Sequence, residues 1–160
     1  MIEVYKCTTK NLGFHPSFSR HGKVQVNLLC SFSLTKTFIN TPHMYFVSKR
    51  IEISYAHQLS LDYKSKCQRL HGHNGIITVY CCAETLDRNG MVVDFTHLKE
   101  LVTERLDHRN LNDLFDFNTT AENMARWICE QIPQAYKVVF QESEGNIAAY
   151  IRPGFEHLGF

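Results

Sequence analysis

The chain has 160 residues, of which 44% are hydrophobic and 21% are charged, a composition typical of one globular domain with a sizeable core. Its 17 lysines and arginines nearly balance 16 aspartates and glutamates, which argues against nucleic acid as the main partner. No apolar run approaches the roughly 20 residues that span a bilayer, so we expect no membrane partner. The six cysteines lack the spacing of a disulfide framework, which favours a reducing, cytoplasmic compartment.

Residues 1–43 differ in composition from the rest of the chain. They are rich in Ser, Thr, Asn and Lys, and only Val24–Leu34 has the pattern of a strand. This run starts too late for a signal peptide, and no small-residue cleavage pattern follows it. A well-patterned strand begins directly after Met44, so we interpret Met44 as the natural start. Residues 1–43 are then an N-terminal extension, either not native or poorly ordered, and residues 44–160 are the functional domain.

The first half of this domain reads as a set of strands. We predict one strand over Tyr45–Leu59 and a second over Leu70–Thr85, joined by the polar loop Asp62–Arg69. The Asn-Gly pair at 89–90 is a strong hairpin signal. It predicts that Met91–Phe95 returns as a short strand.

The second half of the domain predicts two helices and two further strands. One helix is expected over Thr96–Arg105. The other begins near Thr119, whose spacing to Glu122 is that of a capping box, and stops at Pro133. The two strands are Tyr136–Gln141 and Ile147–Ile151. The order of elements indicates an α+β fold, an antiparallel four-stranded sheet with two helices on one face.

His71-Gly72-His73 is the most informative motif of the chain. Residues two apart on a strand point to the same face, so the two imidazoles can converge on one point. His57, near the end of the preceding predicted strand, is a third candidate. Three neutral imidazoles without a fourth protein ligand are typical of a catalytic zinc, which keeps one position open for water or substrate. An HxH pair by itself is a weak indication of a metal site.

Three other positions carry residue types that suit catalysis or binding. Cys67 lies four residues before His71 in a basic loop, where positive charge favours the reactive thiolate; an ordinary loop cysteine is the alternative. Asp107 and His108 could act as a carboxylate–imidazole pair, as in catalytic triads, or belong to a solvated loop. Glu142 could bind a planar ligand edge that carries two N–H donors, or be a surface charge.

Six segments add to these candidates, and they follow one another over residues 46–152. They are Ser54–His57, Cys67–Asn74, Gly90–Phe95, Leu106–Asn112, Thr120–Asn123 and Gln141–Ser143. Together they resemble the 6-pyruvoyl-tetrahydropterin synthase family, most closely its bacterial branch of 6-carboxy-5,6,7,8-tetrahydropterin synthases. The resemblance implies the tunnelling fold, in which small subunits oligomerise into a barrel. Such proteins are usually homohexamers, dimers of trimers, with active sites between subunits.

The resemblance also implies a role for each candidate residue. The implied Zn²⁺ ligands are His57, His71 and His73. The implied catalytic acid/base group is Cys67, Asp107 and His108. The residues implied to bind the aminopyrimidinone edge of a pterin are Glu142 and, as an assisting group, Thr120.

The substrate implied by the resemblance is a small molecule, 7,8-dihydroneopterin triphosphate. The carboxy branch converts it to 6-carboxy-5,6,7,8-tetrahydropterin, acetaldehyde and triphosphate in queuosine (7-deazaguanine) biosynthesis. The pyruvoyl branch eliminates triphosphate and keeps the three-carbon side chain. The compact Cys-x-x-x-His spacing from Cys67 to His71 favours the carboxy branch. The pyruvoyl activity and a non-catalytic pterin- or zinc-binding protein of the same fold are the alternatives.

Two features depart from the family pattern. Gly75 stands where an aromatic or other bulky residue is common, and we expect it to loosen the packing beside the metal ligands. The extension of residues 1–43 is also foreign to the family. The groups that receive the triphosphate are not singled out by any pattern; the basic candidates are Arg50, Lys64, Lys66 and Arg69.

Overall fold

The computed structural model describes residues 2–6, 35–39 and 43–158 and divides the chain into two units, Met1–Pro42 and His43–Phe160. In the first unit, β1 (Ile2–Lys6) and β2 (Thr35–Ile39) form an antiparallel pair. The predicted strand-like run Val24–Leu34 lies outside the described residues. The division falls beside the boundary expected from the sequence, and the origin of residues 1–43 stays a prediction.

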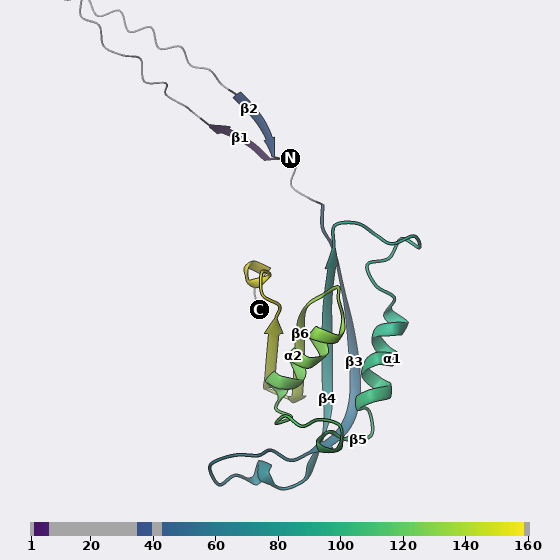
Figure 1. Ribbon diagram of the computed structural model, residues 1–160, viewed down its shortest axis with the longest axis vertical. Coiled ribbons are helices and arrows are strands. Elements are labelled where there is room, and N and C mark those ends of the chain that lie inside the picture. Colours follow the sequence, from purple (N-terminus) through teal and green to yellow (C-terminus); the bar gives the residue numbers. More distant parts are fainter. Residues whose placement is uncertain (1, 7–34, 40–42, 159–160) are drawn as a thin grey trace, which may run out of the picture. The chain divides into compact units, whose positions relative to one another are not determined.

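The second unit is built around a five-stranded sheet with the strand order β5-β3-β4-β6-β7. The strands are β3 (Tyr45–His57), β4 (His71–Ala83), β5 (Arg109–Asn110), β6 (Ala135–Ser143) and β7 (Asn146–Ile151). Neighbouring strands are antiparallel except β5, which runs parallel to β3. Figure 1 shows β3 and β4 as the long central strands, with β5 at their lower end.

Two expectations about strands are corrected: Met91–Phe95 forms no strand, and β5 raises the sheet from four strands to five. Met91–Phe95 is not a strand, because the Asp87 carboxylate accepts hydrogen bonds from the backbone N–H groups of Asn89 and Met91, both at 2.8 Å. This tight turn directs the chain into a helix instead of a returning strand. β5 was not predicted because its two residues carry no alternating pattern, and only their pairing with β3 makes them a strand.

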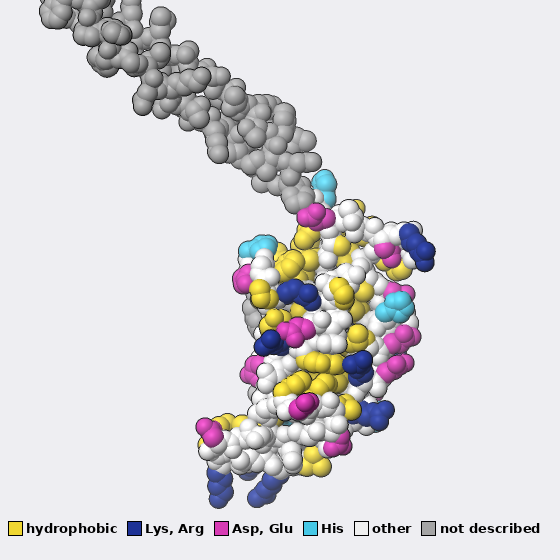
Figure 2. Space-filling view, viewed as in Figure 1, with side chains coloured by type: hydrophobic (Ala, Val, Ile, Leu, Met, Phe, Trp, Pro, Cys, Tyr) yellow, Lys and Arg dark blue, Asp and Glu magenta, His cyan; other side chains and the backbone are white. Residues whose placement is uncertain are grey.

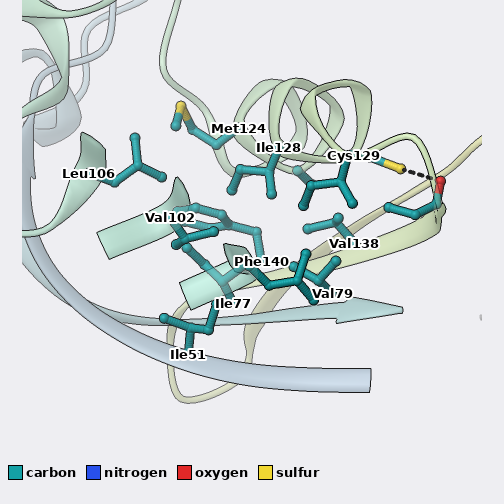
Figure 3. Close-up of a cluster of buried hydrophobic side chains, with 14 of the residues drawn as sticks. Ile51, Ile77, Val79, Val102, Leu106, Met124, Ile128, Cys129, Val138 and Phe140 are labelled. Atoms are coloured by element: carbon teal, nitrogen blue, oxygen red, sulfur yellow. Dashed lines mark hydrogen bonds between the residues drawn. The ribbon is translucent and has the colours of Figure 1, made fainter. Parts of the chain in front are cut away.

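Both helices, α1 (Phe95–Leu106) and α2 (Ala121–Gln131), pack on the sheet as predicted. α1 lies against β3, and α2 lies against β6 and β7 (Figure 1). Their apolar stripes and the alternate residues of the strands enclose one core, shown in Figure 3. Its labelled members are Ile51, Ile77, Val79, Val102, Leu106, Met124, Ile128, Cys129, Val138 and Phe140. No helix in the described part of the chain is long and apolar enough to cross a membrane.

The start of α2 differs from the capping box that the sequence predicts. The helix is capped by Thr120, whose hydroxyl accepts a hydrogen bond from the Asn123 N–H. Thr119 is fully buried instead, and its side-chain oxygen lies 3.3 Å from Nδ1 of His57. The cap is therefore Thr120 and not Thr119, whose side chain lies beside His57 instead of at the helix start.

Candidate active site

Three histidines meet at the end of the β3–β4 pair. His57 is directly opposite His71 in the antiparallel register, and His73 lies two residues further along the same face of β4. One ligand atom from each of the three side chains lies within 4.8 Å of the other two. The convergence predicted from the HxH spacing and from His57 is therefore present in the structure.

Backbone carbonyls fix the orientation of two of these imidazoles. Nδ1 of His57 lies 2.9 Å from the Thr119 carbonyl oxygen, and Nδ1 of His71 lies 2.8 Å from that of Arg69. A carbonyl oxygen can only accept, so both Nδ1 atoms carry the proton and donate it. The Nε2 lone pairs are left available, which is how metal-binding histidines are commonly held.

Two of the nitrogen atoms in this group make no hydrogen bond to the protein. Nε2 of His57 and Nε2 of His73 are both buried without a hydrogen bond. A buried polar atom left unsatisfied costs about 1–3 kcal/mol, and a metal ion at this point would satisfy both. Burial also lowers the pKa of His57, which favours the neutral form that binds metals. The residues therefore fit a metal ion.

Glu142 is brought to the edge of the histidine group. Its Oε1 atom lies 3.7 Å from Nε2 of His57 and 3.4 Å from the Tyr55 hydroxyl. It sits on β6 where the register with β7 shifts between Gln141 and Ser143. The structure thus places the predicted ligand-binding carboxylate beside the predicted metal ligands.

Tyr55 belongs to the site as well, although sequence reasoning gave it no role. Its ring is 4% exposed and is surrounded by the rings of His57, His73 and Phe140, with centroids 5.3, 5.5 and 5.8 Å away. Burial, together with the nearby Glu142 carboxylate, raises the pKa of the Tyr55 hydroxyl, so this group stays protonated. The sequence signal that could have identified Tyr55 is its position on the same face of β3 as His57.

Gly75 does not loosen the packing beside the histidines, contrary to expectation. A Cβ atom built on Gly75 would lie 2.9 Å from Cε1 of Tyr55 and 3.3 Å from the Gln141 carbonyl oxygen. The tyrosine ring occupies the space that a side chain at position 75 would need. The position is a glycine because its neighbour on β3 is large.

Asp107 and His108 form the predicted pair. Their side chains meet at 3.0 Å, between Oδ1 of Asp107 and Nδ1 of His108. The backbone N–H of Ser54 donates to the same carboxylate at 2.8 Å and is the main reason that the pKa of Asp107 is lowered. His108 has a φ of 55°, an uncommon backbone conformation that is held by its N–H donating to the Ser54 carbonyl.

This pair is not joined to the three histidines within one chain. The His108 side chain is 81% exposed. It borders a cleft of about 500 Å³ whose lining includes Tyr55 and His73 as well as Ser54, Ala56 and Asn74. Side chains alternate along a strand, so Ser54, Ala56 and Asn74 point away from the sheet face that carries the His57 and His73 side chains. The acid/base pair thus lies beside strand residues whose side chains face away from the three-histidine group.

Cys67 lies in the loop between the two histidine-bearing strands. It is the central residue of a single 3-10 turn, Lys66–Gln68, which is fixed by a capping box between Ser65 and Gln68. Its carbonyl accepts a hydrogen bond from the Leu59 N–H at 2.7 Å. The thiol is free and half-buried. Its catalytic role stays a prediction, as does the substrate-binding role of Thr120 at the start of α2.

A five-stranded sheet with two helices on one face and a three-histidine group at one end defines a small α+β domain suited to metal-assisted chemistry. A family model described as 6-pyruvoyl tetrahydropterin synthase matches residues 46–153. The chain therefore belongs to the 6-pyruvoyl tetrahydropterin synthase family, as its motifs indicate.

Individual relatives bear names from both branches. The chain is 30% identical over 118 residues to 6-carboxy-5,6,7,8-tetrahydropterin synthase of Bacillus subtilis, which covers 69% of this chain and 80% of the relative. It is 34% identical over 129 residues to the enzyme of the same name from Synechocystis, with 72% and 99% covered. The structure of Caenorhabditis elegans 6-pyruvoyl tetrahydropterin synthase matches with a TM-score of 0.57 at 29% identity, covering 68% of this chain and 96% of that one.

Proposed function

We propose that this protein is a zinc-dependent lyase that converts 7,8-dihydroneopterin triphosphate to 6-carboxy-5,6,7,8-tetrahydropterin, acetaldehyde and triphosphate, in queuosine (7-deazaguanine) biosynthesis. The convergence of His57, His71 and His73 beside Glu142, in a chain of this family, carries the proposal. The carboxy branch is favoured because both sequence relatives described above bear that name. The short spacing from Cys67 to His71 points the same way.

The histidine group and Glu142 would bind different parts of the substrate. Three neutral nitrogen donors suit zinc, which when bound supplies a Lewis acid for the hydroxyl groups of the substrate side chain. The Glu142 carboxylate would accept hydrogen bonds from the two N–H donors of the pterin edge, as carboxylates do with arginine. Thr120 would assist this contact.

Cys67 and the Asp107–His108 pair would move the protons. As a thiolate, Cys67 would remove a proton from the substrate side chain. Nδ1 of His108 is held by Asp107, so its Nε2 atom is the one free to exchange a proton with the substrate.

We propose that these groups come together between subunits of a homo-oligomer, a hexamer built as a dimer of trimers. The exposure of His108 at an open cleft supports this arrangement, because its neighbours Ser54 and Asn74 lie on the opposite sheet face from the His57 and His73 side chains. The loop from β3 to β4 would contribute positive charge for the triphosphate through its exposed Lys64, Lys66 and Arg69. Figure 2 shows basic side chains at the lower end of the molecule, where this loop lies in Figure 1.

Mass spectrometry of the products tests the proposal directly. Zinc-loaded protein is incubated with 7,8-dihydroneopterin triphosphate, and the expected products are 6-carboxy-5,6,7,8-tetrahydropterin and acetaldehyde. A pterin that keeps its three-carbon side chain would assign the pyruvoyl activity, the name that the Caenorhabditis elegans structural neighbour bears. Unchanged substrate with zinc bound would favour a binding protein of the same fold.

A further inference from the structure

Tyr55 on β3 reaches across a strand to contact Glu142 on β6. These two strands are not neighbours, because β4 lies between them in the sheet. The Tyr55 hydroxyl nevertheless lies 3.4 Å from Oε1 of Glu142, and no other hydrogen bond to that carboxylate is present in the described part of the chain. A buried side chain on one strand is thus in position to orient a carboxylate two strands away.

Gly75 makes this reach possible. It lies on β4 between the two side chains, and a Cβ there would come within 2.9 Å of the tyrosine ring. The ring has little freedom to yield, because His57, His73 and Phe140 surround it. The Tyr55 ring therefore needs a glycine at position 75, and a side chain there would displace the ring.

We propose that Tyr55 is a positioning residue of the pterin site. Its hydroxyl donates a hydrogen bond to Glu142 and fixes that carboxylate for the ligand. Gly75 is required because it leaves room for the Tyr55 ring. A carboxylate has about four lone-pair positions, so one donation from Tyr55 leaves enough for the two N–H groups of a pterin. The Glu142 side chain is 22% exposed, so without this donor it is free to turn towards solvent. The inference rests on the proposed function, which assigns Glu142 to a pterin.

Pterin binding in a set of four proteins tests the inference. Zinc-loaded wild type, Tyr55→Phe, Glu142→Ala and the double variant are titrated with neopterin by fluorescence, and zinc content is measured for each. Tyr55→Phe keeps the ring and removes only the hydroxyl, so we expect Kd to rise about three- to tenfold with zinc content unchanged. In the Glu142→Ala background, the same change should have no further effect, because the group that it positions is absent. Tyr45→Phe, at the exposed far end of β3, is the matched control.

An equal loss in both backgrounds, or no loss in either, would overturn the positioning role. Crystal structures of zinc-loaded wild type and Tyr55→Phe give a second readout that needs no pterin. We expect one Glu142 conformation in the wild type and a displaced or multiple one in the variant; an unchanged carboxylate would also overturn the inference. If the wild type binds no neopterin but Glu142 is displaced in Tyr55→Phe, the pterin assignment is refuted and the Tyr55–Glu142 contact stands.

Discussion

The three-histidine group at the end of the β3–β4 pair is enclosed within one protomer, whereas the Asp107–His108 pair beside β5 is left open. His57 and His71 are fixed by backbone carbonyls, and buried nitrogens of His57 and His73 face a common centre. At the β5 edge, His108 is 81% exposed and its imidazole is held by Asp107. The first region is assembled within one chain by the β3–β4 register and by the Thr119 and Arg69 carbonyls, whereas the second presents its imidazole to an open cleft. The proposed function therefore predicts that a single chain can bind the metal and that turnover requires the assembly.

The largest expected effect is the loss of metal on His71→Ala. Removing one of three ligands leaves two, and we expect metal affinity to fall by about a hundredfold or more, with activity lost. Elemental analysis of purified protein measures it. His97→Ala, an exposed histidine on α1, is the control. Normal metal content in His71→Ala would refute the ligand assignment.

Cys67→Ala should separate binding from turnover. The thiol is absent from the histidine group, so zinc content and pterin affinity should stay at wild-type levels. We expect kcat to fall by roughly 10²–10⁴-fold, the range for loss of a proton-transferring side chain. Cys82→Ala, at the other end of β4, is the control. Wild-type turnover by Cys67→Ala would exclude Cys67 from the chemistry.

Glu142→Ala should weaken pterin binding without releasing the metal. Loss of a carboxylate that accepts two hydrogen bonds is expected to raise the Kd for neopterin by about 10–100-fold, while zinc content remains normal. Fluorescence titration beside elemental analysis distinguishes the two effects. Glu144→Ala, at the exposed turn after β6, should bind like the wild type. An unchanged Kd would remove Glu142 from the pterin site.

Mixing two inactive variants tests whether the acid/base pair serves a neighbouring protomer. His71→Ala lacks the metal site and His108→Ala lacks the acid/base group. If active sites lie between subunits, random reassembly of the two in equal amounts should restore intact sites to about a quarter of the wild-type number. Steady-state rates after mixing measure this, and each variant reassembled with itself is the control. No recovery in hexamers shown to be mixed would place the whole site in one chain.

The sequence was sufficient for the features that depend on local periodicity. Alternation predicted β3 and β4 to within two residues at their ends, and it placed His57, His71 and His73 on converging faces. Helical spacing predicted α1 and α2. Family motifs singled out Glu142 and the Asp107–His108 pair, which the structure brings beside His57 and into mutual contact.

Features that depend on contacts between distant segments were decided only by the tertiary structure. β5 is a strand because β3 offers it an edge, and the Thr119 carbonyl accepts a hydrogen bond from His57, 62 residues away in the chain. Gly75 appeared to be a loss of packing when taken alone. Its absent side chain is compensated by Tyr55, from another strand. The sequence by itself thus determined which faces and residue types meet. Only folding decided which side chains share the space between them, because a close-packed site is set by neighbours far apart in the chain.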